Sequence, residues 1–164
     1  LVIGQDETAG ELHDRLAELG AAALTNVVDR LDAGEKLPGR RQNAEDATYA
    51  PKLLKEHGRV DWSLPSEEIR NRVRGVTPWP GAITTYCGTD RCEEVTLTEV
   101  GTRPNGENGE TPGTVVEITD EENVAVRAGK GLVVIRRLKP ANSREMAAAD
   151  FVIGHRVETG DTFD

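Results

Sequence analysis

Two groups of basic side chains are the residues of this sequence best suited to chemistry, and that chemistry is the binding of phosphate. The first group contains Lys52, Lys55, Arg59, Arg70, Arg72 and Arg74, and the second contains Arg136, Arg137, Lys139 and Arg144. Clustered Lys and Arg side chains neutralise phosphates along a nucleic-acid backbone and so position a protein on it. A cluster of charge is also often only a solvated surface, so both interpretations stay open for each group.

The cysteines and histidines offer little further chemistry. Cys87 and Cys92 flank the segment Gly88-Thr89-Asp90-Arg91, which is typical of a hairpin turn. A disulfide across that hairpin is geometrically conceivable, but two free thiols in a reducing compartment are the favoured interpretation. Tetrahedral zinc needs four ligands with paired spacing, and the three histidines occur singly. The sequence therefore predicts no metal site.

The distribution of charge is uneven along the chain. The formal net charge is −9, made up of −6 in residues 1–35, +3 in residues 36–92 and −6 in residues 93–164. Only 5 of the 20 basic residues are lysine, and the apolar fraction is 37%. Salt screens the self-repulsion of such an acidic chain. We therefore expect a halophilic protein with a basic middle section between two acidic ends.

Length and hydropathy limit the class of protein. A chain of 164 residues is enough for one domain, with room for a fragment of another. No apolar run approaches the roughly 20 residues that cross a bilayer, and the first residues show no signal-peptide pattern. The chain also starts at Leu1 without an initiator Met. We expect a soluble, cytoplasmic protein that is truncated relative to a longer one.

A long amphipathic helix is the first element that the sequence predicts, over residues 8–34. Thr8 and Glu11 have the spacing of a capping box, and Gly34 is a typical stop. One apolar stripe follows the helix at intervals of three or four residues; it comprises Leu12, Leu16, Leu19, Ala23, Val27 and Leu31. Such a stripe must be buried against something, and no partner for it is obvious within the chain.

The rest of the chain predicts a small barrel. After a linker, a short helix is expected from about Ser66 to Arg74, and a last helix from about Arg144 to Ile153 with Ser143 as its N-cap. Between them we expect five strands, at Ala82–Cys87, Cys92–Val100, Gly113–Thr119, Asn123–Arg127 and Leu132–Lys139. The predicted fold class is α+β, mainly β: a five-stranded barrel of the oligonucleotide/oligosaccharide-binding (OB) type, preceded by the long helix and a linker.

Three aromatic residues near the first basic group have two interpretations each. Trp62 and Trp79 could stack on bases, but prolines close to each favour packing at the junction between linker and barrel. Tyr49 either anchors the linker between two domains or simply packs. Phe151 has the helical spacing of a core residue.

Several segments, in order along the chain, carry a resemblance to a known family. They are Thr8-Ala9-Gly10-Glu11-Leu12-His13; Ala47-Thr48-Tyr49-Ala50-Pro51-Lys52-Leu53 followed by Gly58-Arg59-Val60-Asp61-Trp62; Pro78-Trp79-Pro80-Gly81-Ala82; Pro112-Gly113-Thr114-Val115; and Met146-Ala147-Ala148-Ala149-Asp150-Phe151. Together they resemble the methionyl-tRNA formyltransferases over nearly the whole chain. The acidity and the loop at 105–110 depart from that pattern.

The resemblance implies the C-terminal part of a two-domain enzyme. Such enzymes transfer a formyl group from 10-formyltetrahydrofolate to the amino group of methionyl initiator tRNA, using an Asn, a His and an Asp of a Rossmann-like domain. Those three residues would all precede this chain, so the resemblance implies no catalytic residue and no bound cofactor within it. The resemblance implies that residues 1–35 are the end of the catalytic domain, 36–56 an interdomain linker, and 57–164 an OB-like barrel that holds the tRNA.

Three hypotheses for the function follow. The first is that this chain binds RNA non-specifically through its basic groups and does not catalyse. The second is that it is the C-terminal region of a relative acting on a sugar nucleotide. The third is a stand-alone interaction module, in which the first helix pairs with a second copy to form a homodimer.

Overall fold

The computed structural model describes residues 1–104, 109–119 and 121–164, and it divides into two compact units, Leu1–Leu53 and Leu54–Asp164. Residues 105–108, which belong to the predicted polar loop, lie outside the described residues. None of the helices in the described ranges is long and apolar enough to cross a membrane.

The first unit is built around helix α1, which runs from Ala9–Asp32. The predicted capping box is present: the Thr8 hydroxyl accepts from Glu11 N at 3.3 Å, and the Glu11 carboxylate accepts from Thr8 N at 2.8 Å. Gly34 follows the helix with φ +80°, a conformation that glycine adopts without strain. A short 3₁₀ helix, η1 (Ala44–Asp46), lies in the segment predicted as a linker.

The apolar stripe of α1 is exposed to solvent. No residue of α1 is buried, and the exposed fractions of Leu16, Leu19 and Leu31 are 51%, 51% and 55%. An amphipathic helix ordinarily covers its apolar face with another element. The stripe is therefore an exposed apolar surface of this helix.

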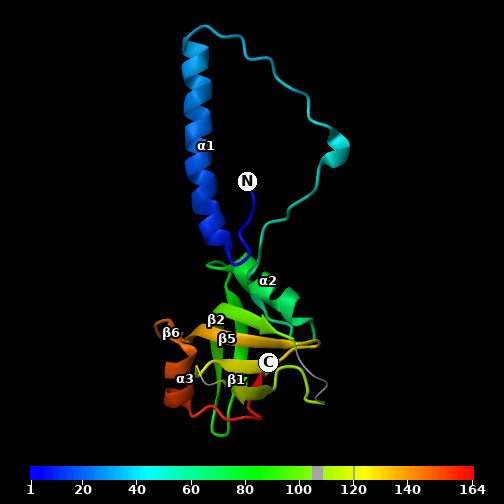
Figure 1. The fold of residues 1–164 in the computed structure, drawn as a ribbon, viewed down its shortest axis with the longest axis vertical. Helices are drawn as coiled ribbons and strands as arrows, with labels where there is room; N and C mark the ends of the chain where they lie inside the picture. Colours follow the sequence, from blue (N-terminus) through cyan, green and yellow to red (C-terminus); the bar gives the residue numbers. More distant parts are fainter. Residues whose placement is uncertain (105–108, 120) are drawn as a thin grey trace. The chain divides into compact units, whose positions relative to one another are not determined.

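The second unit is a seven-stranded sheet, counted over the described residues, that curves into a nearly closed barrel (Figure 1). Its main strands are β1 (Ala82–Cys87), β2 (Cys92–Arg103), β3 (Val115–Ile118), β4 (Val124–Arg127) and β5 (Leu132–Pro140). The order is β3-β4-β5-β2-β1-β7, and β6 (Met146–Ala147) pairs with β5. All five predicted strands are present, and the five-strand count was too low because β6 and β7 are only two residues long.

Strand β7 (Thr162–Phe163) brings the two edges of the sheet together. It pairs with β1 at Tyr86 and Cys87, and an isolated bridge joins Thr162 to Thr114, next to β3. Phe163 N also donates to the carbonyl oxygen of Gly113 at 2.8 Å. An unpaired strand edge leaves backbone hydrogen-bonding groups unsatisfied, so this closure satisfies groups on both β1 and β3.

The core lies inside this barrel and is mostly aliphatic. Alternate residues along each strand face inward, which is why Val95 and Leu97 of β2 and Val124 and Val126 of β4 are almost completely buried. Four aromatic side chains complete the core: Trp62, Tyr86, Phe151 and Phe163. The prediction that Phe151 is a core residue is confirmed, since its exposed fraction is 0%.

Two α-helices accompany the barrel. Helix α2 (Ser66–Val76) buries Ile69, Val73 and Val76, and helix α3 (Ala148–His155) buries Ala148 and Phe151 beside β5 and β6 (Figure 1). The prediction that the last helix begins near Arg144, with Ser143 as its cap, was wrong. Residues 146–147 pair with β5 in extended conformation, so the helix starts only at Ala148.

Candidate nucleic-acid interface

Five members of the first basic group lie in or next to the 3₁₀ helix η2 (Lys55–Gly58) and in helix α2. Lys52 belongs to the first compact unit, whereas the other five members belong to the second. Five of the six predicted cations are therefore in one unit. Their availability for a phosphate depends on which acidic side chains already neutralise them.

Backbone contacts with β1 hold the segment after η2 in place. Val60 N donates to Ile83 O at 2.9 Å, and Arg59 forms a parallel bridge to Ile83. A Cβ atom on Gly58 would lie 2.1 Å from the carbonyl oxygen of Gly81, so only glycine allows this close approach. Lys55 and Arg59 are exposed on this fixed segment, and neither makes an ion pair with any described residue.

The arginines of α2 differ from one another. Arg70 contacts Glu67 at 3.4 Å, and Arg74 donates to the side-chain oxygen of Asn71 at 3.0 Å. Arg72 is exposed and has no ion pair within the described ranges, although its charge helps to lower the pKa of Asp61, after the larger effect of hydrogen bonds from Ser63. Arg72 is therefore the α2 arginine with the guanidinium least engaged by the protein itself.

The second basic group is partly neutralised. Arg136 lies 3.6 Å from Glu99, and Arg137 donates to Glu145 at 2.9 Å. The Arg137 hydrogen bond, followed by one from Thr98, lowers the pKa of Glu145, and Glu145 in turn raises the pKa of Arg137. These contacts stabilise the charged forms of both partners.

Two register shifts between β2 and β5 produce this arrangement. Leu97 pairs with Leu138, Glu99 with Arg137, and Val100 with Ile135, so Thr98 on one strand and Arg136 on the other are extra residues. A bulge re-aims the side chains beside it. Lys139 and Arg144 are exposed and have no ion pair among the described residues, so they are the available cations of this second group.

The two tryptophans have different environments. Trp62 is 5% exposed, and its indole N–H donates to the Thr84 hydroxyl at 3.0 Å. The packing interpretation of Trp62 is confirmed. Trp79, in contrast, is 53% exposed, so the expectation that both indoles pack was wrong for this one. It lies outside both elements, in the turn between α2 and β1, with Pro78 and Pro80 on either side.

Tyr49, the other exposed aromatic residue, is 90% exposed in the first unit. This exposure does not support the interpretation in which the Tyr49 side chain simply packs.

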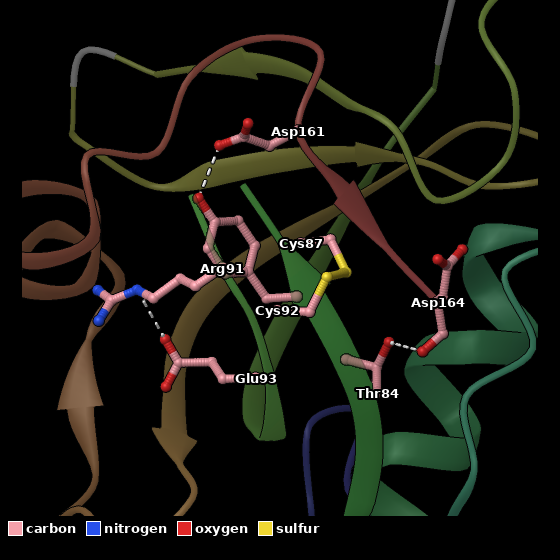
Figure 2. Close-up of a disulfide and its surroundings, with 8 residues drawn as sticks. Thr84, Cys87, Arg91, Cys92, Glu93, Asp161 and Asp164 are labelled. Carbon is pink, nitrogen blue, oxygen red and sulfur yellow. Dashed lines mark hydrogen bonds and ion pairs between the residues drawn. A yellow bond between two sulfur atoms is a disulfide. The ribbon is translucent and has the colours of Figure 1, made fainter. Parts of the chain in front are cut away.

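The cysteines form a disulfide, which corrects the prediction of two free thiols (Figure 2). Cys87 and Cys92 face each other in the β1–β2 hairpin with their Cα atoms 4.1 Å apart.

The nearby Tyr86 hydroxyl donates to Asp161 at 2.6 Å, and the Thr84 hydroxyl donates to the Asp164 carbonyl at 2.9 Å. Burial, followed by the Asp161 hydrogen bond, raises the pKa of Tyr86. This region therefore ties the hairpin to the chain's last residues.

A shallow recess of about 460 Å³ lies beside Arg59. Its lining is mainly apolar, from Val60, Trp62, Pro112 and Phe163.

The described residues contain no group of three or more His, Cys, Asp or Glu side chains that could hold a metal ion. The second unit thus combines exposed cations, which suit contact with phosphates, with an exposed indole, on which a base can stack.

Comparison with known proteins identifies the family. Residues 52–156 match the formyl transferase, C-terminal domain family. The chain belongs to this family. It is 40% identical to a methionyl-tRNA formyltransferase of Symbiobacterium thermophilum over 98% of the chain and 48% of that protein. A methionyl-tRNA formyltransferase of Heliobacterium modesticaldum is 37% identical over 99% of the chain and 52% of that protein. The chain thus spans about half the length of the curated relatives that it matches.

Solved structures support the fold. A HypX variant from Aquifex aeolicus matches with a TM-score of 0.65 at 20% identity, over 91% of this chain and 26% of that one. HypX from the same organism in complex with tetrahydrofolic acid matches with a TM-score of 0.58 at 23% identity, over 79% and 22%. At this level of identity the likeness concerns the fold alone.

Proposed function

We propose that this chain is the tRNA-holding, C-terminal part of a methionyl-tRNA formyltransferase. The observation that carries the proposal is the set of exposed cations with no ion pair within the described residues, Lys55, Arg59 and Arg72, on a family member whose relatives bear that name. Such cations bind phosphates with release of counterions, and no acidic side chain has to be displaced first. The cytoplasm, where tRNA is aminoacylated, is the proposed location.

All ten predicted basic residues remain proposed contacts with RNA, with unequal contributions. Lys52, Lys55, Arg59, Arg72, Lys139 and Arg144 would contribute most, because they make no ion pair within the described residues. Arg70, Arg74, Arg136 and Arg137 would contribute less, since each already contacts a neighbouring side chain. A cation must give up such a contact before it can neutralise a phosphate.

Formyl transfer itself is proposed for the longer protein. There, a domain preceding this chain would transfer the formyl group of 10-formyltetrahydrofolate to methionyl initiator tRNA. Residues 1–35 would be the end of that domain, residues 36–56 a linker, and residues 57–164 an OB-like barrel. The chain alone would then bind RNA non-specifically and have no transferase activity.

Binding of tRNA at several salt concentrations tests the proposal. We expect the logarithm of the association constant to fall linearly with the logarithm of salt concentration. Lys55→Ala combined with Arg59→Ala should reduce the steepness of that line by about 0.7–0.9 per lost phosphate contact. The matched control is Arg136→Ala with Arg137→Ala, which removes the same charge from ion-paired positions and should change the slope less.

Two results would contradict the proposal. Equal slopes for the two double variants would show that the unpaired cations are not the phosphate contacts. Formylation of methionyl-tRNA by the 164-residue chain alone would show that the catalytic groups lie within it.

Self-association is a second candidate function, favoured by the exposed stripe of α1. Pairing of two copies along Leu16, Leu19 and Leu31 would bury apolar side chains that are each about half exposed, at 51%, 51% and 55%. Light scattering should then show a dimer that dissociates on dilution, and Leu19→Glu should give a monomer. A wild-type chain that stays monomeric at millimolar concentration would rule out this function.

A further inference from the structure

Trp79 is the exposed aromatic residue of the second unit. The other aromatic side chains of that unit, Trp62, Tyr86, Phe151 and Phe163, are all at most 5% exposed, whereas Trp79 is 53% exposed. Exposing a large apolar ring forgoes the free energy that its burial would give. The exposed face of the indole is also a surface on which another flat ring can stack.

The turn that carries Trp79 is held at both ends. Thr77 at its start donates its hydroxyl to Val73 O at 2.7 Å, and Gly81 N at its end donates to Val76 O at 2.9 Å. Between these anchors, Pro78 and Pro80 flank Trp79, and each proline ring fixes its own φ angle. The indole is therefore presented on a short turn with few backbone conformations open to it. Little conformational entropy remains to be lost when a ligand binds.

Cations lie beside this turn. Gly58 approaches so closely that a Cβ atom on it would lie 3.3 Å from Pro80 Cγ, the proline that follows Trp79. Lys55 and Arg59 belong to the same short segment as Gly58, are exposed, and have no ion pair with the described residues. A rigid exposed ring next to two free cations is the combination by which proteins bind single-stranded nucleic acid.

The acids of α2 do not oppose this arrangement. Glu67 and Glu68 occupy the first turn of the helix, whereas the Trp79 turn follows its last residue, Val76. At 1.5 Å per residue, the two ends of this helix are roughly 15 Å apart. Glu56 and Asp61 are the acids nearest in sequence to Lys55 and Arg59, and neither forms an ion pair with these cations within the described residues; Asp61 accepts instead from Ser63.

We propose that Trp79 is a stacking platform for an unpaired nucleobase of an RNA, while Lys55 and Arg59 bind the phosphates beside that base. The inference rests on the proposed function and deepens it by naming the part of the RNA that is held. In an RNA duplex the bases are stacked inside and their faces are covered, so only a single-stranded loop or end can place a base on Trp79. Single strands should therefore bind more tightly than duplexes of equal length.

The test compares variants of the full 164-residue chain. Binding of labelled oligoadenylate of about 12 nucleotides, a length within the usual site sizes, is measured by fluorescence anisotropy, beside an RNA duplex of equal length and whole tRNA. Trp79→Ala should weaken oligoadenylate binding by about 5- to 150-fold, and Trp79→Phe should retain part of the affinity. The control is Ile153→Ala, which shortens another exposed apolar side chain, 70% exposed, and should have no effect.

Two further readouts separate stacking from a loss of folding or charge. The steepness of the salt dependence should be the same for Trp79→Ala and wild type, because the phosphate contacts remain. Intrinsic fluorescence should be quenched by oligoadenylate in the wild type and not in Trp79→Phe, where the buried Trp62 is the remaining indole. Neither the salt dependence nor the fluorescence quenching changes with the free energy of unfolding as long as the variant stays folded.

The outcomes distinguish the inference from the proposed function. If tRNA binds with the expected salt dependence while Trp79→Ala binds oligoadenylate as the wild type does, the stacking platform is wrong and the tRNA-holding function stands. Equal affinity for the single strand and the duplex would overturn the inference in the same way. If no RNA binds at any salt concentration, both proposals fail.

Discussion

Replacing Phe163 by alanine should destabilise the barrel severely, although this residue is the second from the end of the sequence. Its ring is 1% exposed and lies 5.9 Å from the Trp62 ring and 5.2 Å from the Tyr86 ring, measured between centroids. Truncating a buried Phe to Ala costs about 3–5 kcal/mol of unfolding free energy. Domains are ordinarily stable by only ~5–15 kcal/mol, so the loss is a large share.

Urea unfolding followed by tryptophan fluorescence is a suitable assay, because Trp62 is buried against Phe163. With a denaturant slope of about 2 kcal/mol per molar, the midpoint should fall by about 2 M at an unchanged slope. Phe163→Leu, which keeps most of the apolar volume, should fall less. Ile153→Ala is the surface control, and its midpoint should shift by less than ~0.3 M.

A midpoint shift below about 0.5 M for Phe163→Ala, corresponding to ~1 kcal/mol, would refute the reasoning. It would show that β7 is not packed on the barrel in solution. The barrel would then be open between β1 and β3, and the hydrogen bonds of Phe163 N and Asp161 O with that edge would not contribute to stability.

Three further predictions concern charge and crosslinking. The pKa of Tyr86 is raised by burial and by Asp161. The contribution of Tyr86 to stability is therefore complete below the unfolded-state pKa of about 10, and it is lost as pH rises toward the folded-state value. Urea midpoints from pH 8 to 11 should fall for the wild type, and Tyr86→Phe should remove part of that pH dependence. Reduction of the Cys87–Cys92 disulfide, which closes a loop of about six residues, should lower the unfolding free energy by about 2 kcal/mol; a Cys87→Ser/Cys92→Ser variant should not respond to reductant, and two titratable thiols in the unreduced protein would contradict the crosslink. Because the net charge is −9 and salt screens self-repulsion, midpoints measured in multimolar KCl should exceed those in dilute buffer; equal stability would contradict salt adaptation.

Local signals in the sequence predicted the main elements well. The Thr8–Glu11 capping box gave the start of α1, and alternation with turn residues predicted Ala82–Cys87 with the bounds that β1 has. The errors lie where pairing between distant segments overrides local preference. Residues 146–147 have the composition of a helix start, but hydrogen bonds from β5 hold them extended. Strand β7 is too short for periodicity to reveal it.

The candidate site was predicted as a set of residues but not as an arrangement. Composition and spacing named Lys55, Arg59 and Arg72, yet they gave no way to distinguish these free cations from Arg136 and Arg137, which acids neutralise. Glu145 reaches Arg137 only because the chain turns back after β5. Likewise, nothing in the sequence distinguished Trp79 from Trp62, since both have prolines nearby.

The sequence by itself determined the family, the amphipathic first helix, the strand-rich second part and the inventory of charge, because each of these depends on residue identity and short-range spacing. Tertiary structure alone decided which cations are free, which indole is exposed, that the two cysteines are bonded, and that the last residues bring the two edges of the barrel together. Most of these depend on contacts between residues far apart along the chain, such as Tyr86 with Asp161, whereas the Cys87–Cys92 bond depends on pairing across the β1–β2 hairpin. Local propensity does not encode such contacts, since they are selected by burial and backbone pairing in the folded barrel.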